Sequence, residues 1–290
     1  MKKYSSQYGQ GAIEYLLIIA AAILVVAIVI LAITGALSSG QEQAGASEQA
    51  QGNSFAKLNL INIEDSMVLY WKLNGNATDY FGMNNGVADG GVDLTAQGKF
   101  SQGAKFDLDN KFITANKAIM VGNKVTYGGW VKFDSFNCPG GFCLVMEQDS
   151  SNEDSFEIYA NSTTYPTNPP DAVYGGDPSR KATLTDSNIY CWDGLVSWKV
   201  AGEGWPVKAG QWYNVYCVHD GIKMCLWVDG EKRFCWNSIE NVKEVNFDIG
   251  LLKENNGYDL EGTIDEVMVW NRTLKDSELK ALYEIGSEIR

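Results

Sequence analysis

Six cysteines are the residues of this 290-residue chain whose number and spacing most directly suggest chemistry. No two of them form a C-x-x-C pair and the chain has a single histidine, His219, so zinc ligation is not expected. An even number of cysteines in an exported domain favours disulfide bonds, with the pairing left open. The alternative is a set of buried free thiols in a reducing compartment. The cysteines are Cys138, Cys143, Cys191, Cys217, Cys225 and Cys235.

A carboxylate, Glu14, stands at the leading edge of a long apolar run, Leu16 to Ile33. At about 1.5 Å per residue this run predicts a helix close to the hydrocarbon thickness of a bilayer, about 30 Å. A carboxylate in a membrane helix is costly without a partner, so Glu14 is predicted to be functional. Lys2 and Lys3 are expected on the cytoplasmic side, which leaves the C-terminal body outside the cell.

The sequence from Gly9 to Leu16, GQGAIEYL, resembles the class III signal peptide of archaeal type IV pilin-like proteins. The resemblance implies a prepilin peptidase that cuts between Gly9 and Gln10 and leaves the hydrophobic helix on the mature chain. Glu14 would then neutralise the new amine of a neighbouring copy, because an unpaired buried charge is strongly unfavourable. We therefore predict a leader at 1–9, a membrane or filament-core helix at 10–37 and a linker at 38–65. A plain signal anchor is the alternative.

The composition indicates a folded body that does not bind nucleic acid. Hydrophobic residues make up 45% of the chain and charged residues 20%, which is typical of a globular protein. The formal net charge of −13 argues against a nucleic-acid partner, which needs a basic face. Thirty glycines and an aromatic share of 12% favour a β-rich body with many turns.

Short apolar runs separated by turn residues predict a succession of strands from residue 66 onward. Asp220-Gly221 and Asp229-Gly230 each separate two such runs, and Asp-Gly is a strong hairpin signal because the turn needs positive φ. Thr273 and Asp276 indicate a capping box that opens a helix through Tyr283. Residues 161–187 contain a proline-rich break and are predicted to be a loop insertion. The predicted strands are 68–73, 103–108, 125–133, 142–147, 155–160, 213–218, 223–228, 232–235 and 262–270.

Six segments of this body resemble the laminin-G-like, concanavalin A-like jelly-roll family. The resemblance spans about residues 66–285 and implies an antiparallel jelly-roll β-sandwich. The predicted fold class is therefore mainly β, with an N-terminal hydrophobic α-helix followed by that sandwich. The segments are YWKLNG at 70–75, DYFGMNNG at 79–86, GGWV at 128–131, GQWYNV at 210–215, LWVDG at 226–230 and IDEVMVWNR at 264–272.

The resemblance also implies a structural Ca²⁺ near the start and end of the domain. Asp79 and Asn85 lie in the second segment and Asp265 in the last, and hard oxygen ligands of this kind suit Ca²⁺. The alternative is that Asp79 caps a turn and Asp265 accepts backbone hydrogen bonds.

Surface glycans are the expected ligands, because sugar sites combine an aromatic platform with a few polar groups. Four tryptophans outside the family segments are the candidates for such a platform, with core packing as the alternative for each. These are Trp192, Trp198, Trp205 and Trp236. Three N-x-S/T sequons predict glycosylation of an exported chain, at Asn76, Asn161 and Asn271.

Catalysis is not expected. Related glucanases carry paired carboxylates along one strand, and the chain has no E-x-D-x-E motif, the nearest run being Glu153 to Glu157. The sequence thus predicts a type IV pilus-like surface filament subunit, either a pilin or an adhesive minor pilin, that displays a lectin-like domain outside the cell. Its expected partners are the prepilin peptidase, other copies of itself or other pilins, the membrane before assembly, and surface glycans. An anchored lectin-like protein that does not polymerise is the second interpretation, and an anchored glycoside hydrolase is the third.

Overall fold

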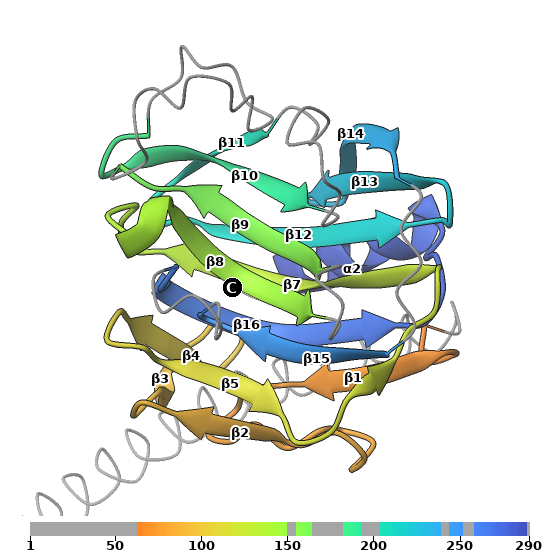
Figure 1. Cartoon of the computed structure of the whole chain (residues 1–290), viewed down its shortest axis with the longest axis horizontal. Helices are drawn as coiled ribbons and strands as arrows, with labels where there is room; N and C mark the ends of the chain where they lie inside the picture. The colour runs from red at the N-terminus through yellow and green to blue at the C-terminus, as the bar shows by residue number, and fades with distance from the viewer. Residues whose placement is uncertain are drawn as a thin grey trace, which may run out of the picture. The chain divides into compact units, whose positions relative to one another are not determined.

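The computed structural model describes residues 63–149, 155–163, 182–192, 204–238, 244–251 and 258–288. All of them belong to one compact unit, Lys57–Arg290. Within this unit two antiparallel sheets pack face to face, which confirms the predicted β-sandwich (Figure 1). The predicted N-terminal helix at 10–37 lies outside the described residues. Among those that are described, no helix is long and apolar enough to cross a membrane.

Sheet A contains most of the strands predicted from the sequence. Its order is β14-β13-β12-β7-β16-β4-β3, and β1 also pairs with β16. The strands are β1 (Met67–Trp71), β3 (Asp93–Gln97), β4 (Gln102–Asp107), β7 (Val125–Phe133), β12 (Trp212–His219), β13 (Lys223–Val228), β14 (Glu231–Asn237) and β16 (Glu261–Trp270).

Sheet B has the order β11-β10-β9-β8-β15-β5-β2, and β6 also pairs with β15. A short 3-10 helix, Pro139–Gly141, precedes β8. The strands are β2 (Gly86–Asp89), β5 (Phe112–Ala115), β6 (Ile119–Met120), β8 (Phe142–Asp149), β9 (Ser155–Asn161), β10 (Asp186–Trp192), β11 (Trp205–Lys208) and β15 (Glu244–Ile249).

The core lies between the sheets and is built by alternation along each strand. In β1, Leu69 and Trp71 are fully buried while the residues between and beside them are only partly so. In β9, Phe156 and Ile158 enter the same core from the other sheet. Successive side chains of a strand point to opposite faces, so each inward residue places its neighbour on the outer face of its sheet.

All six cysteines pair, which confirms the disulfide prediction and resolves its open connectivity. Cys138 pairs with Cys143 at the start of β8, and Cys225 with Cys235 across β13 and β14. The third disulfide joins Cys191 of β10 to Cys217 of β12 and so connects sheet B to sheet A.

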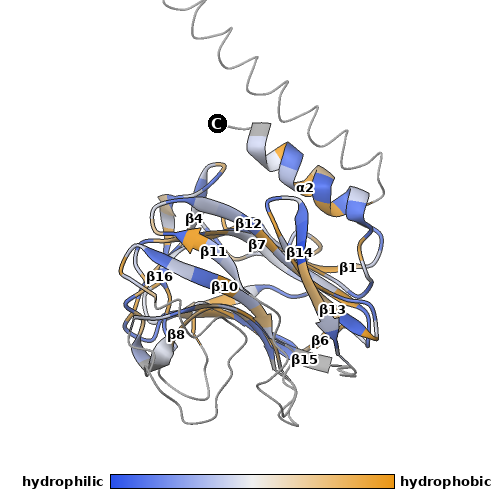
Figure 2. Ribbon diagram, turned by 90° about the horizontal axis from the view of Figure 1, so that it is seen from above, coloured by the Kyte–Doolittle hydropathy of each residue, from blue (hydrophilic) through white to orange (hydrophobic). Residues whose placement is uncertain are grey.

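The C-terminal helix α2 (Asp276–Glu288) packs against the outer face of sheet A through Leu279 and Leu282 (Figure 2). It begins later than the sequence predicted. The Thr273 hydroxyl donates to the carbonyl of His219 at 3.1 Å, so it does not cap the helix. Instead the carboxylate of Glu278 accepts the N–H of Lys275 at 2.6 Å, which is the reverse half of a capping box shifted along the chain.

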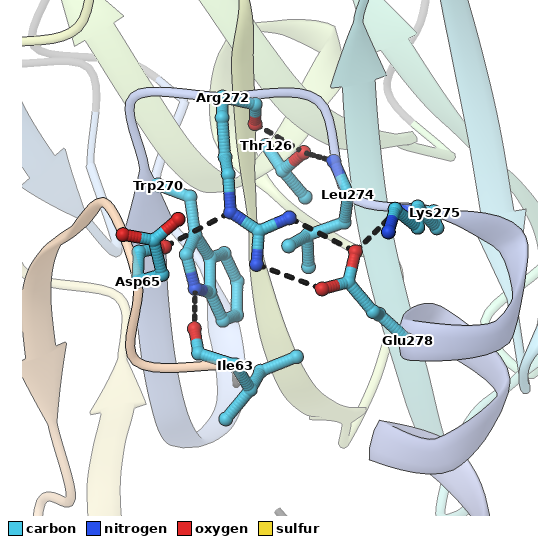
Figure 3. A network of polar contacts seen from close by, with 8 residues as sticks. All are labelled: Ile63, Asp65, Thr126, Trp270, Arg272, Leu274, Lys275 and Glu278. Carbon is cyan, nitrogen blue, oxygen red and sulfur yellow. Dashed lines mark hydrogen bonds and ion pairs between the residues drawn. The ribbon is translucent and has the colours of Figure 1, made fainter. Parts of the chain in front are cut away.

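An arginine ties this helix to the start of the described chain (Figure 3). Arg272 donates to the carbonyl of Asp65 at 2.9 Å and holds Glu278 in a two-pronged ion pair at 2.8 and 2.9 Å. Beside it, the Trp270 indole N–H donates to the carbonyl of Ile63 at 2.6 Å. The two ends of the sandwich are therefore fixed to each other.

Candidate carbohydrate-binding face

The outer face of sheet B carries a group of aromatic and acidic side chains away from the core. It forms because Phe156, Ile158, Ile189 and Cys191 point inward. The alternating residues of β9 and β10 therefore lie on the opposite face, away from sheet A. The strands that build this face are far apart in the sequence but adjacent in the sheet.

Five rings form one aromatic cluster on this face: Phe142, Tyr159, Tyr190, Trp192 and Tyr258. The rings of Tyr159 and Tyr190 stack with their centroids 5.3 Å apart. Phe142 meets Tyr159 at 4.8 Å and Tyr258 at 5.3 Å. Tyr159 and Tyr190 are buried, whereas Phe142, Trp192 and Tyr258 are only half-buried. These three rings therefore keep surface that a ligand can reach.

An acidic row crosses the same face beside the aromatic cluster. Asp248 of β15 lies opposite Glu147 of β8, and Glu147 lies opposite Glu157 of β9. The next position in this row, on β10, is Trp192. Glu147 and Asp248 are buried and Glu157 is half-buried. The register thus places three carboxylates in a line that ends at an aromatic ring.

The electrostatics connect the two groups. Burial and the negative charge of Glu157 raise the pKa of the Tyr258 phenol, which places this phenol beside the acidic row. In the described part of the chain, no three acidic, histidine or cysteine side chains come close enough to hold a metal ion. The half-buried Glu157 carboxylate can accept a hydrogen bond from a sugar hydroxyl and the Tyr258 phenol can donate one, while a half-buried ring packs on the sugar's apolar side.

The predicted tryptophans divide between this face and the core. Trp192 belongs to the aromatic cluster, as the glycan hypothesis requires. Trp236 is buried in the core of the sandwich, so the expectation of an exposed ring is not met there, because β14 turns that side chain inward. Trp205 packs partly on the same core, with the Arg233 guanidinium 3.8 Å from its ring centroid. Trp198 lies outside the described residues.

The predicted calcium ligands already serve the backbone. The carboxylate of Asp79 accepts the N–H groups of Tyr70, Met83 and Asn84 at 2.9 to 3.1 Å. The carboxamide oxygen of Asn85 accepts the N–H of Asp79 at 2.9 Å.

Asp265 is equally occupied: its carboxylate accepts the N–H groups of Lys99, Phe100 and Glu266 at 2.8 to 3.2 Å. This is the arrangement of the alternative interpretation, in which both aspartates satisfy backbone donors. A Ca²⁺ ion would have to share these oxygens, so calcium binding stays a prediction.

The asparagines of the three sequons differ in their exposure to solvent. Asn76 and Asn271 are exposed, whereas Asn161 is half-buried and donates to the Tyr190 hydroxyl at 3.1 Å. Asn161 is thus part of the support of the aromatic cluster. The predicted processing residues Gly9 and Gln10 and the assembly residue Glu14 lie outside the described residues.

Sequence reasoning missed the acidic row because its members are neighbours across strands. Glu157 was considered only with acids of its own segment, and Glu147 and Asp248 are distant in the sequence. The signal that could have found them is register: when β8 and β9 pair in the register of this hairpin, Glu147 and Glu157 lie opposite each other.

Comparisons with known proteins agree with the sandwich. Residues 107–280, more than half of the chain, match the family model of the concanavalin A-like lectin/glucanases superfamily. No curated protein matches.

Among solved structures, domain 4 of AbnA, an extracellular GH43 arabinanase from Geobacillus stearothermophilus solved with arabinotriose, is similar with a TM-score of 0.55. It is 15% identical, and the match covers 75% of this chain and 98% of that one. A Trypanosoma rangeli sialidase in complex with sialic acid has a TM-score of 0.51 at 13% identity, over 78% of this chain and 33% of the sialidase. At such identities the likeness concerns the fold alone. Together with the family match, the jelly-roll arrangement shows that the chain belongs to the concanavalin A-like lectin/glucanase superfamily.

Proposed function

We propose that this domain is an extracellular carbohydrate-binding module that binds its ligand on the outer face of sheet B and does not cleave it. The observation that supports this is the aromatic cluster beside the acidic row, since half-buried rings and clustered polar groups are the usual components of a sugar site. The three disulfides and the family are consistent with an extracellular domain.

The test is glycan binding by the full chain in detergent, measured on an oligosaccharide array and then by titration. Trp192→Ala removes the reachable ring at the end of the acidic row, and we expect it to weaken binding at least tenfold. Ile222→Ala, at an exposed hydrophobic residue in the turn between β12 and β13 of the other sheet, is the control. Equal binding by both variants would refute the assignment of this face.

We further propose that the chain is a subunit of a type IV pilus-like filament, as Gly9, Gln10 and Glu14 predict. Mass spectrometry of a sheared surface fraction tests this independently of the ligand. A mature N-terminus at Gln10 supports it. An N-terminus at Met1 that is confined to membranes favours the anchored lectin-like protein instead.

Hydrolysis is a second candidate function, which one observation favours: Glu147 and Glu157 are directly opposite on neighbouring strands. Opposed residues have Cβ atoms about 4.5–5.5 Å apart. Retaining glycosidases hold the carboxyl groups of their acid and nucleophile about 5–5.5 Å apart, a separation that two glutamate side chains with neighbouring Cβ atoms can reach. If cleavage products of array glycans appear, Glu147→Gln and Glu157→Gln should each abolish them. Glu284→Gln, at an exposed residue of α2, should not. The absence of products from every bound glycan supports binding alone.

A further inference from the structure

The loop between β1 and β2 is held from within by a buried carboxylate. Asp79 is only 2% exposed, and its two oxygens accept three backbone N–H groups, one from β1 and two from the loop itself. Hydrogen bonds from backbone donors to a carboxylate are stronger than neutral ones. The loop is therefore fixed in one conformation relative to β1.

Asn84 anchors the same loop a second time. Its carboxamide donates to the carbonyl of Val68 at 3.0 Å, and its carbonyl accepts the indole N–H of Trp71 at 2.8 Å. The N–H of Gly86 donates to the carbonyl of Ala77 at 2.7 Å and closes the loop. Leu73 and Ala77 of the loop are buried in the core, whereas Tyr80 and Met83 lie exposed on its outside.

Four exposed or half-buried side chains on the outside of this loop form a surface that we call the β1–β2 patch: Lys72, Tyr80, Phe81 and Met83. Tyr80 is 52% exposed and Met83 57%. The Tyr80 and Phe81 rings meet edge to face at 5.2 Å, and the Lys72 ammonium lies 4.8 Å from the Tyr80 ring centroid. A rigid group of exposed aromatic and methionine side chains is the composition enriched in protein interfaces.

The position of the patch indicates what covers it. Phe81 packs against the cluster that contains Ile63 and Trp270, and Ile63 is the first described residue. The patch therefore borders the point where residues 1–62, which include the apolar run Leu16 to Ile33, join the domain.

Charge favours the same partner. Each copy carries a formal charge of −13, so two copies repel wherever acidic surfaces meet. The patch contains no exposed acid and has one cation, Lys72. It is thus a place where copies can approach at low electrostatic cost.

We infer that the β1–β2 patch is the surface through which the domain contacts a second copy of this chain in the filament. This inference rests on the assembly proposed above. Burial of Tyr80 and Met83 by a neighbour would remove apolar surface from water and would explain why the interior of the loop is built to hold both side chains outward.

Site-specific photocrosslinking of the full chain in its own membranes and filaments tests the inference. A benzophenone amino acid replaces Met83 in one variant and Ile222, which is 66% exposed, in the control. Irradiation is expected to give chain-to-chain dimers from position 83 and few or none from position 222. Equal yields at both positions, or no dimer from position 83, would overturn the inference.

Substitution separates this interface from the other proposals. Tyr80→Ala should reduce dimer yield at least fivefold while the melting temperature stays within about 3 °C, because this side chain is 52% exposed. Filaments with a Gln10 terminus but no crosslink at position 83 would refute the patch and leave the filament intact. Dimers on a chain that keeps Met1 would refute the filament and retain the contact. Loss of glycan binding by Tyr80→Ala with unchanged dimers would show that the patch is a glycan site instead.

Discussion

Removal of the disulfide that joins the two sheets should cost more stability than removal of either of the others. Cys191 and Cys217 are separated by 26 residues and Cys225 and Cys235 by 10. Loop-closure entropy then gives about 3.5 kcal/mol for the first disulfide and about 2.7 kcal/mol for the second. For a domain of this size, the first value corresponds to a fall in melting temperature of about 7–14 °C.

The perturbation is the double variant Cys191→Ala/Cys217→Ala, with Cys225→Ala/Cys235→Ala as its control. Thermal and guanidinium unfolding, followed by near-ultraviolet circular dichroism, measure the two losses. The difference should exceed the entropic 0.8 kcal/mol or so, because Cys191 and Cys217 are buried and their removal leaves voids, while Cys235 is exposed. An equal or larger loss in the control would show that connection of the sheets adds nothing to stability.

Three further predictions concern single carboxylates. Burial raises the pKa of Glu278, but hydrogen bonds from Arg272 and from the Lys275 N–H outweigh it and lower the pKa overall. Glu278→Gln should therefore lower the free energy of unfolding, measured with urea, by about 1–3 kcal/mol at pH 7. This difference from wild type should disappear as the pH falls through the carboxyl range. Burial, and after it the negative charge of Asp265, raises the pKa of Glu266 to about 8 in the folded protein. The folded state therefore binds this proton more tightly than the unfolded state, and stability is lost as the pH rises from about 4.5 to 8. Glu266→Gln should therefore melt at a higher temperature than wild type at pH 9 but not at pH 5. Asp79→Ala leaves three buried N–H groups without their acceptor and should cost about 3–5 kcal/mol, whereas exposed Asp89→Ala should change little; equal costs would refute the role of Asp79 in the loop.

Strands with alternating or strongly apolar patterns could be predicted from the sequence, and the weakest could not. The predicted strand at 125–133 coincides with β7, and both Asp-Gly turns connect the hairpins as expected. By contrast, β2 and β3 have only exposed or half-buried residues, so their pattern carries no core signal. They are strands because β5 and β4 offer them edges, which is a tertiary effect.

The candidate site was less predictable than the fold for the same reason. Trp192 could be proposed from its residue type and its position outside the family segments, without knowledge of its neighbours in space. The acidic row can be recognised only from the strand register, because that register makes Glu147, Glu157 and Asp248 neighbours. The register depends on the pairing of three strands and on the bulge between Leu144 and Met146. A shift of one residue would send Glu157 into the core, so no local pattern determines this row.

The two contact surfaces that we propose lie on opposite sides of the sandwich core. Ile63 reaches the domain on the outer side of sheet A, where it joins the cluster of Trp270, Leu279 and Leu282 beneath α2. The aromatic cluster and acidic row lie on the outer face of sheet B, on the other side of the core. Copies that meet through the β1–β2 patch, which adjoins the Ile63 side, would therefore leave the sheet B face open to a ligand. The proposed contact between copies and the proposed glycan binding are therefore compatible, because the core that separates the sheets also separates the two surfaces.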